Sequence, residues 1–186
     1  PDLAALRGRV EAAGAELVAP RVYERNLRYD DTAGSLTPND IVLRLRQDTR
    51  ARLTYKAPGP DPVEGRLTRL EYETEVGDLD TMDAILRKLG FAPYMVYEKY
   101  RTTYHLHGVE VVLDEMPYGD FIEIEGEPDS IERAVAAVGL GDAHRITQSY
   151  ADLFDLIRAE MNLRFTDLTF ENFEGLSVPA TLFERA

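Results

Sequence analysis

The chain has 186 residues, enough for one domain with a sizeable hydrophobic core. Hydrophobic residues make up 44% and charged residues 30%, which is ordinary for a folded protein. The formal net charge of -13 argues against a general nucleic-acid or acidic-membrane surface, so any polyanion site must be a local cluster of cations. The absence of cysteine excludes disulfides, a thiol nucleophile and zinc–thiolate sites. No apolar run approaches the roughly 18 residues of a membrane span, and no signal peptide is visible, so we expect a cytoplasmic protein.

Apolar residues at helical spacing predict a helix at the beginning of the chain and three further helices. Asp2 is suited to cap the first, whose apolar face runs from Leu3 to Leu17. Pro20 is expected to end this unit. The other helices are predicted at about 79–89, 130–138 and 150–161, and residues 166–186 are predicted to form a weakly structured tail that docks through Phe170 and Phe173.

Between these helices, several short segments alternate in character at period two, which is the signature of strands. Clusters of Pro, Gly and Asp separate them. Because few helices lie between the strands, the pattern favours an α+β domain built on antiparallel β structure. The predicted strands are Val22–Asp30, Ile41–Asp48, Arg52–Ala57, Arg66–Val76, Met95–His107, Val109–Met116 and Asp120–Glu125.

Charges of one sign recur on single faces of these predicted strands. Alternation by itself is typical of a half-exposed sheet whose charges lie in water. Same-sign doublets differ from the mixed charges of a solvated surface, and the amphipathic helices need the apolar strand faces as partners. Both features favour charged faces that point inward, where charges must be paired or bind a ligand. The doublets are Arg44 with Arg46, Lys99 with Arg101, Glu71 with Glu73, and Glu123 with Glu125.

The residue types in these doublets indicate a particular ligand. Guanidinium pairs bind phosphate oxygens bidentately, and carboxylate clusters suit hard cations such as Mg²⁺ or Mn²⁺. Cations and carboxylates in one cavity fit a phosphate–metal substrate. Neither a P-loop nor a G-x-G-x-x-G motif is present to support other nucleotide chemistry.

A set of short motifs follows one another in order along the chain. They are Val42-Leu43-Arg44-Leu45-Arg46, Thr54-Tyr55-Lys56, Arg69-Leu70-Glu71-Tyr72-Glu73, Glu98-Lys99-Tyr100-Arg101, Leu113-Asp114, Phe121-Ile122-Glu123-Ile124-Glu125-Gly126 and Ser149-Tyr150. Each motif is weak alone, but their order and spacing over about residues 21–154 are specific. Together they resemble the CYTH superfamily of triphosphate tunnel metalloenzymes.

The resemblance implies an antiparallel eight-stranded β-barrel tunnel with helices packed outside, formed by residues 1–165. In such a tunnel basic residues grip a triphosphate, acidic residues hold one or two Mg²⁺ or Mn²⁺ ions, and the charged strand faces line one continuous channel. Carried over by position, the implied phosphate ligands are Arg44, Arg46, Lys56, Lys99 and Arg101. The implied metal-side carboxylates are Glu71, Glu73, Asp114, Glu123 and Glu125, of which Glu73, Glu123 and Glu125 are expected to be catalytic.

The sequence departs from the family pattern in two places. The family's E-x-E-x-K strand is expected before Pro1, where the sequence begins without an initiator Met, so we expect that a preceding segment was trimmed. The seven predicted strands therefore correspond to the family's eight-stranded tunnel without its first strand. No lysine follows Lys99, so none can reach the site from the C-terminal region, and Arg145 or Arg158 is the candidate substitute.

The expected function is metal-dependent hydrolysis of inorganic tripolyphosphate or an organic triphosphate. The first alternative is a class IV adenylate cyclase, which uses the same pocket to make cyclic AMP from ATP. The second is a non-catalytic binder of polyphosphate or nucleotide, favoured if the natural chain starts at Pro1. A small-molecule triphosphate is the expected partner of a monomer or homodimer, with no role for nucleic acid or a membrane.

Overall fold

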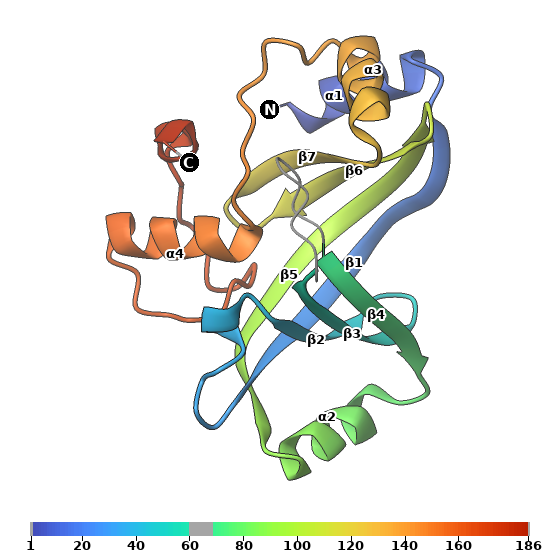
Figure 1. Ribbon diagram of the computed structural model, residues 1–186. Helices are drawn as coiled ribbons and strands as arrows, with labels where there is room; N and C mark the ends of the chain where they lie inside the picture. Colours follow the sequence, from blue (N-terminus) through green and yellow to red (C-terminus); the bar gives the residue numbers. More distant parts are fainter. Residues whose placement is uncertain (1, 60–68, 186) are drawn as a thin grey trace. The chain divides into compact units, whose positions relative to one another are not determined.

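The computed structural model describes residues 2–59 and 69–185 (Figure 1). Two compact units are distinguished: one combines Pro1–Tyr23 with Lys99–Ala186, and the other is Glu24–Glu98. We call them the terminal unit and the central unit. In chain order the elements are α1 (Leu3–Ala12), β1 (Glu16–Asp31), η1 (Thr37–Asn39), β2 (Val42–Gln47), β3 (Ala51–Pro58), β4 (Arg69–Val76), α2 (Leu79–Lys88), β5 (Phe91–Leu106), β6 (Val109–Met116), β7 (Gly119–Glu125), α3 (Pro128–Val138), α4 (Tyr150–Met161) and η2 (Ala180–Arg185).

The described strands form a seven-stranded sheet in the order β4-β3-β2-β1-β5-β6-β7. Every strand pair with a defined register is antiparallel. The predicted α+β class on antiparallel strands is therefore confirmed. Among the described residues, no helix combines the length and apolar character needed to cross a membrane.

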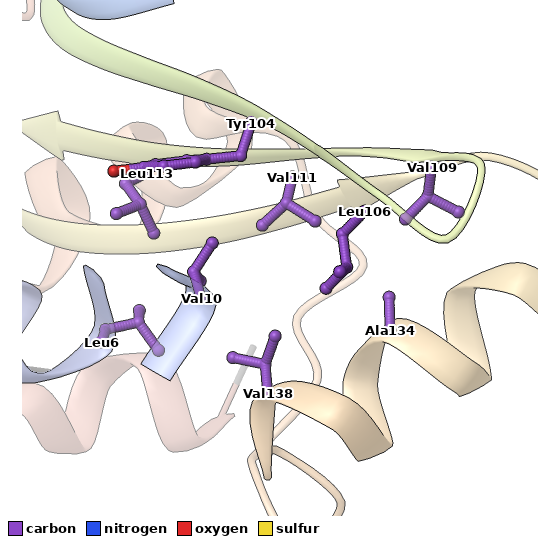
Figure 2. Close-up of a cluster of buried hydrophobic side chains, with 9 residues drawn as sticks. All are labelled: Leu6, Val10, Tyr104, Leu106, Val109, Val111, Leu113, Ala134 and Val138. Carbon is purple, nitrogen blue, oxygen red and sulfur yellow. The ribbon is translucent and has the colours of Figure 1, made fainter. Parts of the chain in front are cut away.

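In the terminal unit, α1 and α3 cover the apolar face of β5, β6 and β7. Figure 2 shows Val10 of α1 and Val138 of α3 pointing toward the side chains of β5 and β6. Ile122 and Ile124 of β7 pack against the same cluster. Because side chains alternate along a strand, the opposite face of these strands carries the remaining, mostly polar residues. The buried members of the cluster are Leu6, Val10, Tyr104, Leu106, Val109, Val111, Leu113, Ala134 and Val138.

The first helix is shorter than its apolar spacing predicts. Asp2 caps it as expected, since its carboxylate accepts hydrogen bonds from the backbone N–H groups of Ala4 and Ala5 at 3.0 and 3.2 Å. The prediction that the helix extends to Leu17 is wrong, because Gly14 adopts φ 84° directly after the last turn and ends it. Pro20 lies within β1, ahead of the residues that pair with β2, where a missing N–H breaks no hydrogen bond to that strand.

In the central unit, α2 covers the apolar face of the neighbouring strands. Leu86 of α2 is buried against Leu45 of β2 and Tyr29 of β1. The Tyr29 hydroxyl donates to Asp83 of α2 at 2.7 Å. Both units therefore place helices on the apolar side of the strands: α1 and α3 in the terminal unit, and α2 in the central unit.

Other predicted boundaries differ by a few residues. β5 begins at Phe91 rather than Met95, and β4 begins at Arg69, while residues 66–68 of the predicted strand lie outside the described residues. The tail packs through aromatic side chains: Phe173 is buried and contacts Phe154 and Phe165, and the ring of Phe170 lies 5.3 Å from that of Tyr100. The division into a domain at 1–165 and a separate tail stays a prediction.

Candidate functional site

The central unit presents polar side chains from four strands on one face. The register places Arg28 of β1 opposite Arg44 of β2, Arg44 opposite Thr54 of β3, and Thr54 opposite Glu73 of β4. One row further along, Asn26, Arg46, Arg52 and Glu75 are paired in the same sequence. Lys56 and Glu71 form a third, shorter row. We call this set the central charged face.

Two arginines predicted to bind phosphate lie at the middle of this face, where each is partly held by neutral groups. Arg44 donates to the Tyr97 hydroxyl at 3.2 Å and to the Thr54 hydroxyl at 3.3 Å. Its contact with the Glu73 carboxylate is long, at 3.8 Å. Arg46 is 9% exposed and donates from Nε to the Asn26 side chain at 2.9 Å.

The β4 carboxylates pair with cations of β3. Glu73 accepts a hydrogen bond from Thr54 at 2.8 Å and lies 3.3 Å from Arg52. Burial raises the pKa of Glu73, but the Thr54 hydrogen bond and the charges of Arg52 and Arg44 outweigh it, so the pKa is lowered and the group is ionised at neutral pH. Lys56 pairs with Glu71 at 3.0 Å, and both of these side chains are about one-third or more exposed.

The central charged face contains buried donors that the described residues do not satisfy. Four such nitrogens are Asn26 Nδ2 and the Nε atoms of Arg28, Arg44 and Arg52. Buried polar groups in folded proteins almost always have a hydrogen-bond partner, so a group of orphaned donors requires an explanation. An anion with several oxygen acceptors is the ligand that such a group of donors suits.

The terminal unit has a second face of this kind, on β5, β6 and β7. Arg101 of β5 lies directly opposite Asp114 of β6. The Asp114 carboxylate, which is 0% exposed, accepts from Lys99 at 2.9 Å, from Arg101 Nε at 2.7 Å and from the Tyr150 hydroxyl at 3.0 Å. A second Arg101 nitrogen, Nη2, also donates to this carboxylate. We call Lys99, Arg101, Asp114 and Glu123 the terminal charged face.

The two β7 carboxylates are less buried than Asp114. Glu123 accepts from Arg101 at 2.6 Å, and its side chain is 32% exposed. Glu125 lies two residues further along β7 on the same face, opposite Glu110 of β6, and is exposed. Met116 pairs with Gly119, so β6 and β7 form a hairpin. Asp114 pairs with Phe121, and so does not lie at the same level as Glu125.

The described residues do not build a metal cage from protein alone. No group of three or more His, Asp or Glu side chains gathers to hold an ion in the described ranges 2–59 and 69–185. Mg²⁺ in phosphate-binding sites is commonly held by one or two carboxylates together with substrate phosphates and water, a donor set that Glu123 and Glu125 fit. On the central charged face, Glu71 and Glu73 of β4 are likewise two carboxylates on one face of a strand.

A pocket of about 950 Å³ in the terminal unit runs along β7, and residues of α3, the segment 143–148 and the tail complete its lining. Glu123, Glu125 and Tyr150 line it as well. The proposed substitutes for a late lysine are engaged elsewhere: Arg145 also lines the pocket but pairs with Glu132 at 2.6 Å, and Arg158 contacts Asp155 at 3.3 Å.

Four residues that contact the predicted site residues were given no role in the site by the sequence. Thr54, Asn26 and Tyr97 contact Arg44 or Arg46, and Tyr150 contacts Asp114. Asn26 and Thr54 lie at period-two positions with charged residues, which is a signal available from the sequence. Tyr97 and Tyr150 are brought to the charged faces by tertiary contacts, and no spacing rule indicates which group a tyrosine hydroxyl will contact.

Three comparisons place the chain among known proteins. The family model described as the CYTH domain matches residues 5–150. A protein of Methanocaldococcus jannaschii named "putative adenylate cyclase" is 29% identical over 105 residues, which cover 55% of this chain and only 59% of that relative. The structure of a "putative adenylate cyclase" from Vibrio parahaemolyticus superposes with a TM-score of 0.66 at 21% identity, covering 82% of this chain and 91% of the other.

A further solved structure adds an activity to this group. It is a "putative adenylyl cyclase" from Hippeastrum with a dominant triphosphatase activity, and it matches with a TM-score of 0.59 at 20% identity over 86% of this chain and 92% of the other. Fold and site together define an α+β protein whose antiparallel strands present faces of cations and carboxylates, with helices on their apolar side. With the family model matching most of its length, the chain belongs to the CYTH family.

Proposed function

We propose that the protein binds a triphosphate and hydrolyses it with the help of Mg²⁺ or Mn²⁺. The observation that carries this proposal is the set of buried nitrogen donors on the central charged face that have no partner among the described residues. Guanidinium groups in a fixed arrangement suit phosphate oxygens. The triphosphatase activity of the Hippeastrum protein is a second support.

Phosphoryl transfer needs positioning and charge neutralisation more than a covalent nucleophile. In the proposed function Arg44, Arg46 and Lys56 of the central unit bind phosphate oxygens, as do Lys99 and Arg101 of the terminal unit. Arg44 suits this role because its contacts to Tyr97 and Thr54 fix its orientation without cancelling its charge. These hydroxyls hold the guanidinium in place before the ligand arrives, which reduces the entropy lost on binding.

The metal is proposed to be held by the β7 carboxylates Glu123 and Glu125, with Glu71 and Glu73 as the corresponding pair in the central unit. A divalent ion bound there supplies neutralisation of phosphate charge and activation of water. Glu73, Glu123 and Glu125 are also the candidate catalytic carboxylates. We propose a cytoplasmic monomer or homodimer that acts on a small molecule, without nucleic acid or a membrane as partner.

Adenylate cyclase is the second candidate, because the M. jannaschii and V. parahaemolyticus relatives carry that name. A non-catalytic polyphosphate binder is the third, and it differs from the others in having affinity without turnover. One panel separates the three: tripolyphosphate, thiamine triphosphate and ATP are each incubated with Mg²⁺ or Mn²⁺ and analysed for phosphate, pyrophosphate and cyclic AMP. We expect phosphate release. Cyclic AMP with pyrophosphate as the main products from ATP, or binding without any product, would replace the proposal with one of its rivals.

A further inference from the structure

The two carboxylates of the terminal charged face, Asp114 and Glu123, are bound differently. Both oxygens of Asp114 accept hydrogen bonds: Oδ1 from Arg101 Nε at 2.7 Å, and Oδ2 from Lys99 at 2.9 Å, from the Tyr150 hydroxyl at 3.0 Å and from Arg101 Nη2. Its side chain is 0% exposed, and that of Lys99 is 3% exposed. The carboxylate is therefore enclosed by two cations and a hydroxyl.

These surroundings are unfavourable for a metal ion. A divalent cation that approached Asp114 would displace donors and meet the ammonium of Lys99 and the guanidinium of Arg101 at hydrogen-bond distance, where like charges repel strongly. Burial raises the pKa of Asp114, but the Arg101 hydrogen bonds and the two cationic charges outweigh it and lower the pKa. Glu123, in contrast, is 32% exposed and contacts Arg101.

Tyr150 is held so that its hydroxyl reaches Asp114. It is the first residue of α4, which is capped by a reciprocal pair of contacts between Ser149 and Asp152. Its backbone oxygen accepts from the Tyr118 hydroxyl at 3.1 Å. The Lys99 ammonium lies 5.4 Å from the centre of the Tyr150 ring, within the range of a cation–π contact.

We infer that Asp114 is a positioning residue that holds Lys99 and Arg101 in place, with Tyr150 as its neutral fourth donor, and that it is not a metal ligand. This revises the metal-side role that the family resemblance implies for Asp114. Its effect on triphosphate binding rests on the proposed function, whereas its role as counter-ion does not. Removal of Asp114 takes away the carboxylate that contacts both of these cations, and Lys99 is only 3% exposed.

The first test measures thermal unfolding in EDTA for wild type, Asp114→Asn and the matched control Glu110→Gln, an exposed carboxylate on the same strand. Loss of the buried counter-ion is expected to lower the melting temperature by roughly 6–20 °C, while the control stays close to wild type. A melting temperature of Asp114→Asn at or above that of wild type would show that the carboxylate repels its neighbours, as metal ligands do without metal, and would overturn the inference.

Two further measurements separate positioning from a purely structural role. The rise in melting temperature caused by Mn²⁺ is expected to be equal in wild type and Asp114→Asn, and a smaller rise in the variant would restore the metal role. By calorimetry in EDTA, well below the melting temperatures, tripolyphosphate should bind about tenfold more weakly to Asp114→Asn and about threefold more weakly to Tyr150→Phe. Unchanged or tighter binding in both variants would overturn the positioning role. Absence of binding by wild type would instead refute the proposed function, while the unfolding comparison would still decide the counter-ion role.

Discussion

Arg44 offers the sharpest test of the central charged face, because its side chain is only 12% exposed and it is oriented by two neutral hydroxyls. Arg44→Ala removes a guanidinium whose hydrogen bonds to a charged ligand are worth about 1.5–3 kcal/mol. This corresponds to a loss of roughly 13- to 160-fold in affinity for a triphosphate. Arg44→Lys should recover only part of the loss, because an ammonium cannot replace a planar fork of donors.

The assay is titration calorimetry with tripolyphosphate at a temperature at which all variants are folded. The matched control is Arg50→Ala, which removes an arginine of the connection between β2 and β3 whose side chain is 57% exposed and pairs with Glu75. Exposed ion pairs contribute little, so the control should bind like wild type. Unchanged affinity in Arg44→Ala, or an equal loss in both alanine variants, would show that the central charged face does not bind the ligand.

Three other predictions address the metal, pH and the core. Glu125→Gln is expected to abolish metal-dependent turnover while leaving the fold intact. Mn²⁺ should raise the melting temperature of wild type more than that of the variant, and equal shifts in the two proteins would exclude the metal role of Glu125. Asp30 accepts hydrogen bonds from the backbone of Leu36 and the side chain of Thr37, and although burial raises its pKa, these bonds lower it below 3.8. The ionised carboxylate should therefore stabilise the fold above pH 3.8, and this stabilisation should be lost as the pH falls through the lower folded-state pKa. In urea unfolding, the unfolding free energy of Asp30→Asn should be lower than that of wild type at neutral pH and equal to it in strong acid. Leu113→Ala in the buried cluster should lower the unfolding free energy by about 2–5 kcal/mol. Leu17 is half-exposed, so Leu17→Ala should change it by no more than about 0.5 kcal/mol, and similar losses at both positions would contradict the assigned core.

The sequence by itself determined the antiparallel strands and the face on which each charge lies. Period two is a local property of an extended chain, so Arg44 and Arg46, or Glu123 and Glu125, share a face wherever the strand packs. Helix limits marked by local signals were also predictable: Asp78 and Ser149 cap α2 and α4 at their predicted starts. The end of α1 was missed because Gly14 lies among residues with helical spacing, and that spacing outweighed the glycine signal.

Only the tertiary structure decided which charges neutralise one another. Asp114 and Glu123 look alike in sequence, as acidic residues in neighbouring strands. The register places Asp114 directly opposite Arg101, and α4 brings the Tyr150 hydroxyl to the same carboxylate, so that it is enclosed while Glu123 remains partly exposed. Strand register and helix docking depend on contacts between residues far apart in the chain, which local alternation does not encode. The chemical role of a carboxylate depends on these partners, and for that reason it was decided by the fold.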